Sequence, residues 1–278
     1  MFLIGNRLNT KSANTEAAVL ARDEQYVIET AEAQLDAGAL FLEVGASTLS
    51  EVEREAVLWL LQVIQKMGDV PLALDSGSPE TIGAFLSAVK SRPMLLGLAP
   101  AGAGLHRILP LVSRHLPYVS VLCTNGKGVL PTQEQRFEAA LNTIEIMAEA
   151  GVPTTDLYLD PVLEPLCLSS QGTVVALDTI SSIKRQIQGV RTICSVMGLA
   201  SGLPSPGLLL SGFLMLAEAA GLDAVVADPL DPSVKSGMIS GAALLGLDNA
   251  LARYIKHHNT MALMAESGAK KSSRDKGT

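Results

Sequence analysis

The stretch Asp156-Leu157-Tyr158-Leu159-Asp160-Pro161 has the pattern of a short buried strand that ends in a carboxylate and a proline. An earlier stretch, Val70-Pro71-Leu72-Ala73-Leu74-Asp75, repeats the pattern and leads through Ser76-Gly77-Ser78-Pro79 into a helical segment. An apolar strand that ends in Asp before a helix places a charge at the rim of a sheet. In a barrel of parallel strands, that rim is where active sites lie. The two stretches therefore predict a barrel with both carboxylates at its mouth.

Apolar runs and helical patterns alternate on both sides of these stretches. The predicted strands cover about residues 2–5, 39–44, 71–75, 94–98, 118–123, 156–160, 192–197 and 223–227. Strands that alternate with helices predict a parallel sheet. Eight such units in about 255 residues fit a closed (β/α)₈ TIM barrel better than an open doubly wound sheet. No Gly-x-Gly-x-x-Gly follows the first strand, which argues against a dinucleotide-binding fold.

The expected organisation is one domain with a short tail. The chain has 278 residues, a length that a single α/β barrel reaches. We expect the barrel to cover residues 1–257 and a polar tail to cover residues 258–278, disordered where Lys, Ser and Gly dominate. Between the strands, the pattern predicts a polar loop up to about Arg22, a helix that Ser50 caps, and a last helix over about residues 233–254.

Composition and charge exclude several classes of function. The net charge of −7, with no basic run before the tail, argues against nucleic-acid binding. The longest apolar run, residues 208–217, is interrupted by Ser211 and Gly212 and is too short to span a bilayer. No signal peptide is evident, and three widely spaced cysteines indicate reduced thiols in the cytoplasm. The four histidines have no metal-ligand spacing, so we expect no zinc site.

The predicted strand ends bring an acidic set of residues to one rim. Nearby basic residues are Arg7 and Lys127, and a buried Glu43 would need a partner, for which Arg7 is the candidate. Such a rim suits a neutral or cationic heterocycle, because one carboxylate accepts two parallel hydrogen bonds from a ring N–H and an adjacent amino group. The rim set is Asn6 or Asn9, Glu43, Asp75, Gly97, Asn125, Asp160, Gly198 and Asp228.

Other interpretations of these residues stay open. Asp75 could cap the turn that follows it, and Asp-Pro and Thr-Asn-Gly are common turn sequences, which applies to Asp160 and Asn125. Asp75 and Asp160 could be the acid and base of a glycosidase, although few aromatic residues lie near the strand ends to hold a sugar. Glu43, Asp75 and Asp160 could also ligate a divalent metal.

Five motifs, in this order and spacing, resemble those of the methyltetrahydrofolate:corrinoid methyltransferases, which group with dihydropteroate synthase among the pterin-binding (β/α)₈ barrels. The resemblance extends to about residue 256. The motifs are Ile4-Gly5-Asn6-Arg7-Leu8-Asn9, Leu74-Asp75-Ser76, Leu157-Tyr158-Leu159-Asp160-Pro161, Gly202-Leu203-Pro204 and Ala219-Ala220-Gly221-Leu222-Asp223-Ala224.

The resemblance implies a homodimeric barrel that binds folate at its mouth. It implies transfer of the N5 methyl group between methyltetrahydrofolate and the cobalt of a cobalamin carried by a partner corrinoid protein, without a metal of its own. Asp75 and Asp160 match the family's carboxylates that hold the pterin. Asn9, Ser76 and Asn125 are further candidates for substrate binding.

Four positions depart from the family pattern. Phe41-Leu42-Glu43 replaces Asp-x-Asn, Leu96 and Gly198 replace two pterin-binding asparagines, and Pro206 replaces an arginine. Loss of one polar group that acts in a transition state typically costs about 3 kcal/mol. The leading hypothesis is therefore a methyltransferase of this kind, impaired or with an altered substrate, and the alternative is a non-catalytic scaffold or partner subunit. Dihydropteroate synthase is the less similar relative, because its basic anchors are missing.

Overall fold

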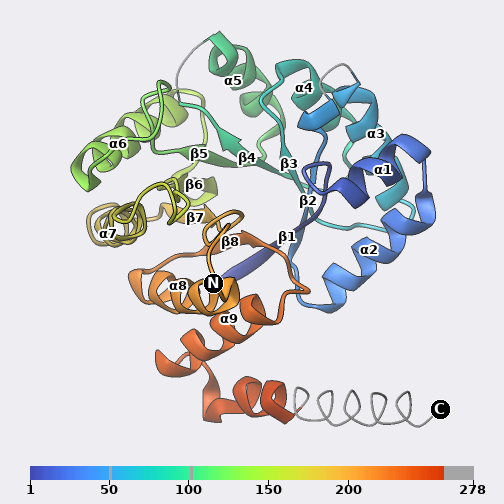
Figure 1. Cartoon of the computed structure of the whole chain (residues 1–278). Coiled ribbons are helices and arrows are strands. Elements are labelled where there is room, and N and C mark those ends of the chain that lie inside the picture. The colour runs from blue at the N-terminus through green and yellow to red at the C-terminus, as the bar shows by residue number, and fades with distance from the viewer. Residues whose placement is uncertain (50–51, 101–102, 260–278) are drawn as a thin grey trace, which may run out of the picture.

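The computed structural model describes residues 1–49, 52–100 and 103–259. Its strands form a closed barrel in which each strand pairs in parallel with the next and the last pairs with the first (Figure 1). The predicted (β/α)₈ fold is confirmed. The strands are β1 (Phe2–Asn9), β2 (Phe41–Gly45), β3 (Leu72–Asp75), β4 (Met94–Leu98), β5 (Tyr118–Leu122), β6 (Leu157–Asp160), β7 (Arg191–Ser195) and β8 (Ala224–Ala227).

Helices surround this ring of strands on the outside (Figure 1). Several begin at a capping side chain: those of Asp23, Ser78 and Thr132 each accept a hydrogen bond from a backbone N–H of the first turn. The helices are α1 (Ala13–Ala21), α2 (Glu24–Asp36), α3 (Glu53–Ile64), α4 (Pro79–Ala88), α5 (Ala103–His115), α6 (Gln133–Glu149), α7 (Gly172–Gln186), α8 (Pro206–Ala220) and α9 (Pro232–Leu244).

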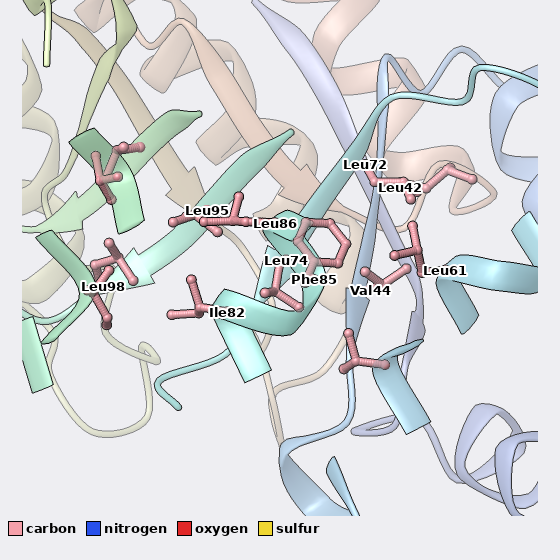
Figure 2. Close-up of a cluster of buried hydrophobic side chains, with 14 of the residues drawn as sticks. Leu42, Val44, Leu61, Leu72, Leu74, Ile82, Phe85, Leu86, Leu95 and Leu98 are labelled. Carbon is pink, nitrogen blue, oxygen red and sulfur yellow. The ribbon is translucent and has the colours of Figure 1, made fainter. Parts of the chain in front are cut away.

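Alternation along each strand divides the apolar residues between two layers. Leu72 and Leu74 of β3 face outward and pack with Phe85 of α4 and Leu61 of α3 (Figure 2). Ala73, between them, belongs to a separate cluster inside the barrel. Since successive side chains of a strand point to opposite faces, Asp75 follows Ala73 on the inner face. The same alternation places Asp160 above Tyr158 in β6.

Aromatic side chains fill the amino-terminal end of the barrel interior. Phe2, Phe41, Tyr118 and Tyr158 come from four strands, and their ring centroids lie 6.1–6.4 Å apart, mostly edge to face. Edge-to-face contacts are a favoured geometry for aromatic rings. This packed end leaves the carboxyl-terminal end of the barrel as the place for a ligand.

The structure corrects two details of the predicted elements. Residues 13–21, expected in a polar loop, form α1, and Arg22 ends it in the left-handed conformation with φ of 55°. The last predicted helix is interrupted: α9 ends at Leu244, and residues 252–259 are helical after a turn at Gly246. The predicted cap Ser50 and residues 260–278 of the predicted tail lie outside the described residues.

Candidate functional site at the barrel mouth

A cavity of about 240 Å³ opens at the carboxyl-terminal ends of the strands. Asp75 and Asp160, both predicted to lie at the barrel mouth, line it, so the two strands that end in Asp meet in one site. A second cavity of about 330 Å³ shares Lys11 and Met197 with the first. The remaining lining of the first cavity consists of Glu43, Leu96, Gly97, Ser120, Leu122, Ile193, Ser195 and Val226.

Asn9 connects two carboxylates on neighbouring strands. Its amide nitrogen donates to Asp75 Oδ2 at 2.9 Å and to Glu43 Oε1. Asn9 reaches this position because the β1–β2 register shifts between Gly5 and Leu8, so that Leu8 packs outward and Asn9 faces inward. Gly45 leaves the necessary room, since a Cβ there would lie 2.7 Å from the Asn9 amide nitrogen.

Lys11 supplies the positive charge of this group. Its ammonium lies 2.6 Å from Asp75 Oδ2. Partial burial by itself lowers the pKa of Lys11, but the hydrogen bond and charge of Asp75, with the charge of Glu43, outweigh burial and raise it. Lys11 is not among the residues predicted from the sequence, because the first apolar run ends at Gly5 and a polar loop is expected beyond it. Lys11 lies two residues after the true end of β1.

Glu43 is the buried acid of the site, with 2% of its surface exposed. Its partner is Asn9, and the expected pairing with Arg7 is wrong, because Arg7 lies 3.4 Å from Asp228 instead. Burial and the charge of Asp75 raise the pKa of Glu43 to about 8, against the lowering effect of the Asn9 amide.

Asp160 is held by the turn that follows β6. Its Oδ1 accepts the backbone N–H of Val162 at 2.8 Å. Burial raises the pKa of Asp160 to about 6, while the Val162 N–H and the positive charge of Arg136 lower it. Arg136, on α6, is fully buried and donates to the backbone oxygens of Pro161 and Val162 at 2.9 and 2.7 Å. Arg136 thus fixes the turn that carries Asp160.

Three predicted substrate-binding residues do not line this cavity. Asn9 lines the adjoining second cavity instead. The buried Ser76 hydroxyl donates to Glu53 Oε1 at 2.7 Å and accepts from the Ser78 N–H, so it links α3 to the start of α4. The exposed Asn125 accepts the Lys127 N–H at 3.0 Å within its own turn and lines a different cavity beside α6.

The positions that depart from the family pattern lie in different places. Leu96 is in β4, inside the barrel, and lines the mouth cavity with Gly97. Gly198 lies beyond β7 in a neighbouring cavity that Pro206 also lines. At the end of β7, Ser195 and Met197 line the mouth cavity.

The described part of the chain contains neither a group of side chains suited to a metal ion nor a helix suited to a membrane. Over residues 1–49, 52–100 and 103–259, no three His, Cys, Asp or Glu side chains are grouped so that they could hold a metal ion. Glu43 and Asp75 are instead joined through Asn9, and Lys11 bonds to Asp75. The same residues include no helix long and apolar enough to cross a bilayer.

Comparisons with known proteins support the resemblance seen in the sequence. No family model matches the chain. The chain is 26% identical over 266 residues to the methylcorrinoid:tetrahydrofolate methyltransferase of Eubacterium limosum. The alignment covers 92% of this chain and 95% of that protein. The structure of a dihydropteroate synthase from Coxiella burnetii, in complex with pteroic acid, superposes with a TM-score of 0.63. That match has 15% sequence identity and covers 87% of this chain and 93% of the other.

The structural match shows the fold, and the sequence match extends over nearly the whole chain. Together with the closed barrel, they show the TIM-barrel fold and support the resemblance to the pterin-binding barrels that the sequence motifs indicate.

Proposed function

We propose that the protein transfers a methyl group between the cobalt of a corrinoid protein and N5 of tetrahydrofolate. The observation that carries the proposal is that Asp75 and Asp160 line one cavity in the barrel mouth. The methylcorrinoid:tetrahydrofolate methyltransferase to which the chain is similar supports the choice of reaction.

Asp75 and Asp160 are the proposed binding groups for the pterin ring. A carboxylate at each position can accept hydrogen bonds from the ring N–H and amino groups of a pterin. The cavity of about 240 Å³ has room for the ring system rather than for the whole folate, and the adjoining cavity of about 330 Å³ can take the tail. Asn9 orients Asp75 by donating a hydrogen bond to it, and Lys11 balances the charge of Asp75.

The chemistry of the transfer determines what the barrel has to do. When the methyl group moves to tetrahydrofolate, the N5 lone pair forms the new N–C bond and the electrons of the Co–C bond remain on cobalt. The N5 proton then leaves. In the opposite direction N5 regains a proton as its methyl group departs. The protein has to bind the ring, exclude water and accommodate that proton.

The same proposal implies binding partners and a cellular location for the protein. A corrinoid protein would bring its cobalamin to the open end of the barrel. We propose a homodimer because leucines of α8 and α9 are exposed: Leu208 and Leu216 lie eight residues apart on α8, and Leu244 ends α9. The free cysteines Cys123, Cys167 and Cys194 support a location in the cytoplasm.

Leu96 favours a second candidate function, a non-catalytic scaffold or partner subunit. Its apolar side chain lies in the mouth where the resemblance implies an amide, and an apolar group cannot satisfy a polar edge of the pterin. The two candidates differ in whether methyl transfer occurs.

Visible spectroscopy of cobalamin tests the proposed reaction. Purified protein is mixed with free methylcobalamin and tetrahydrofolate under reducing, oxygen-free conditions. Conversion of the methylcobalamin spectrum to that of Co(I), dependent on both folate and protein, is the expected result. Folate binding without any conversion, also with methyltetrahydrofolate and Co(I) cobalamin in the reverse direction, would favour the scaffold.

A further inference from the structure

Glu43 has one carboxyl oxygen without a partner. The side chain lines the mouth cavity, and Oε1 accepts a hydrogen bond from Asn9. Oε2 is buried and has no hydrogen-bond partner among the described residues. A buried polar atom without a partner is unusual, and it points to an interaction that the structure without ligand does not contain.

The charges around Glu43 favour a proton on this carboxyl group. The Asn9 amide has two hydrogens, and it donates to Glu43 and to Asp75. The ammonium of Lys11 bonds to Asp75, and its charge lowers the pKa of Glu43 less than burial and the charge of Asp75 raise it. A second negative charge on the buried Glu43 would be compensated only in part, which is a costly arrangement.

We propose that Glu43 binds the ligand as a neutral carboxylic acid, whose O–H on Oε2 donates a hydrogen bond to an acceptor atom of the pterin ring. This inference rests on the proposed function, since it takes the occupant of the mouth to be a reduced pterin. Such a ring offers a carbonyl oxygen and nitrogen lone pairs as acceptors. Asp75 and Asp160 accept hydrogen bonds, so Glu43 adds a donor to a site that otherwise has mainly acceptors.

The proposal predicts a loss of affinity at alkaline pH. The charged or titratable groups that face Glu43 in the mouth are Asp75 from β3, Lys11 beyond β1 and Asp160 from β6. Asp160, with a pKa of about 6, is ionised above neutral pH, and the raised pKa of Lys11 keeps it charged. Glu43, with a pKa of about 8, is the group that loses its proton between pH 7 and 9.5. Since the protonated form of Glu43 binds, affinity is constant between about pH 7 and 8 and falls above pH 8, by up to about tenfold per pH unit.

Titration calorimetry with tetrahydrofolate at pH 6.5, 7.5, 8.5 and 9.5 tests this prediction. For the parent protein, we expect affinity to fall about tenfold or more between pH 7.5 and 9.5. Glu43→Gln keeps an N–H donor that does not titrate, so its affinity should stay within about threefold of its own value at pH 6.5. Glu43→Ala removes the donor and should bind about tenfold more weakly than the parent at pH 6.5.

Three controls separate the possible causes. Glu134→Gln, an exposed change on α6, should follow the parent at every pH. Titration of the ligand itself would appear equally in Glu43→Gln, so an identical alkaline loss in parent and Glu43→Gln would overturn the proposal. A flat profile for the parent would overturn it as well. Absence of binding at every pH would instead count against the proposed function.

Discussion

At the scale of single residues, the most direct predictions concern the two carboxylates that end β3 and β6. Asp75→Asn and Asp160→Asn each turn one acceptor oxygen into a donor that faces the N–H groups of the pterin. We expect each variant to bind tetrahydrofolate about 10- to 100-fold more weakly, the equivalent of about 1–3 kcal/mol, without unfolding. Titration calorimetry measures the affinity and thermal melting checks the fold.

Asp69→Asn is the matched control for these two variants. Asp69 is exposed and lies before β3, at the opposite end of the barrel from the mouth. Its substitution should leave affinity within about twofold. If Asp75→Asn and Asp160→Asn both bound as tightly as Asp69→Asn, the assignment of the pterin to this cavity would be wrong.

At the scale of elements, Arg136 joins α6 to the turn after β6. Besides Pro161 and Val162, its guanidinium donates to the backbone oxygen of Leu130 at 2.7 Å and to Glu164 at 3.0 Å. Arg136→Met would leave these buried and half-buried acceptors without their donor, and we expect it to lower the free energy of unfolding by about 2–4 kcal/mol. Urea unfolding gives this value.

The same substitution should raise the pKa of Asp160, because the positive charge of Arg136 lowers it in the parent. Folate binding by Arg136→Met should then be lost on acidification at a higher pH than in the parent. Arg185→Met, an exposed change on α7, should shift stability by no more than about 0.5 kcal/mol. Equal stability of the two variants would contradict the role assigned to Arg136.

At the scale of the whole molecule, the exposed leucines of α8 and α9 lie outside the barrel, away from the site. Leu216 is 58% exposed. If this face holds the proposed homodimer together, Leu216→Glu places a charge in an apolar interface and should give a monomer. Light scattering coupled to size-exclusion chromatography measures the mass. Leu141→Glu on α6, where Leu141 is 42% exposed, should remain dimeric. A monomeric parent would rule the interface out.

The barrel could be predicted from the sequence because its signals are local. Each buried strand is a short apolar run, and several helices begin at Ser, Thr or Asp caps. Asp75 and Asp160 could be placed at the mouth because strand alternation carries both to the inner face just where the strands end.

The supporting residues could not be predicted in the same way. Asn9 is a candidate from the sequence, but the choice between Asn6 and Asn9 stays open there, because the register shift in β1 that brings Asn9 to Asp75 depends on pairing with β2. Arg136 lies in a largely polar helix, where a basic residue normally indicates an exposed face, yet it is fully buried. Ser76 and Asn125 have suitable side chains near strand ends, but Glu53 and the Lys127 N–H already occupy them.

Titration calorimetry of the parent protein with tetrahydrofolate at pH 7 tests the central claim most directly, that the barrel mouth is a pterin site. We predict one site per chain, with a dissociation constant in the micromolar range or tighter and markedly weaker binding by Asp160→Asn. No detectable heat at millimolar ligand would contradict the claim, as would equal binding by the parent and Asp160→Asn.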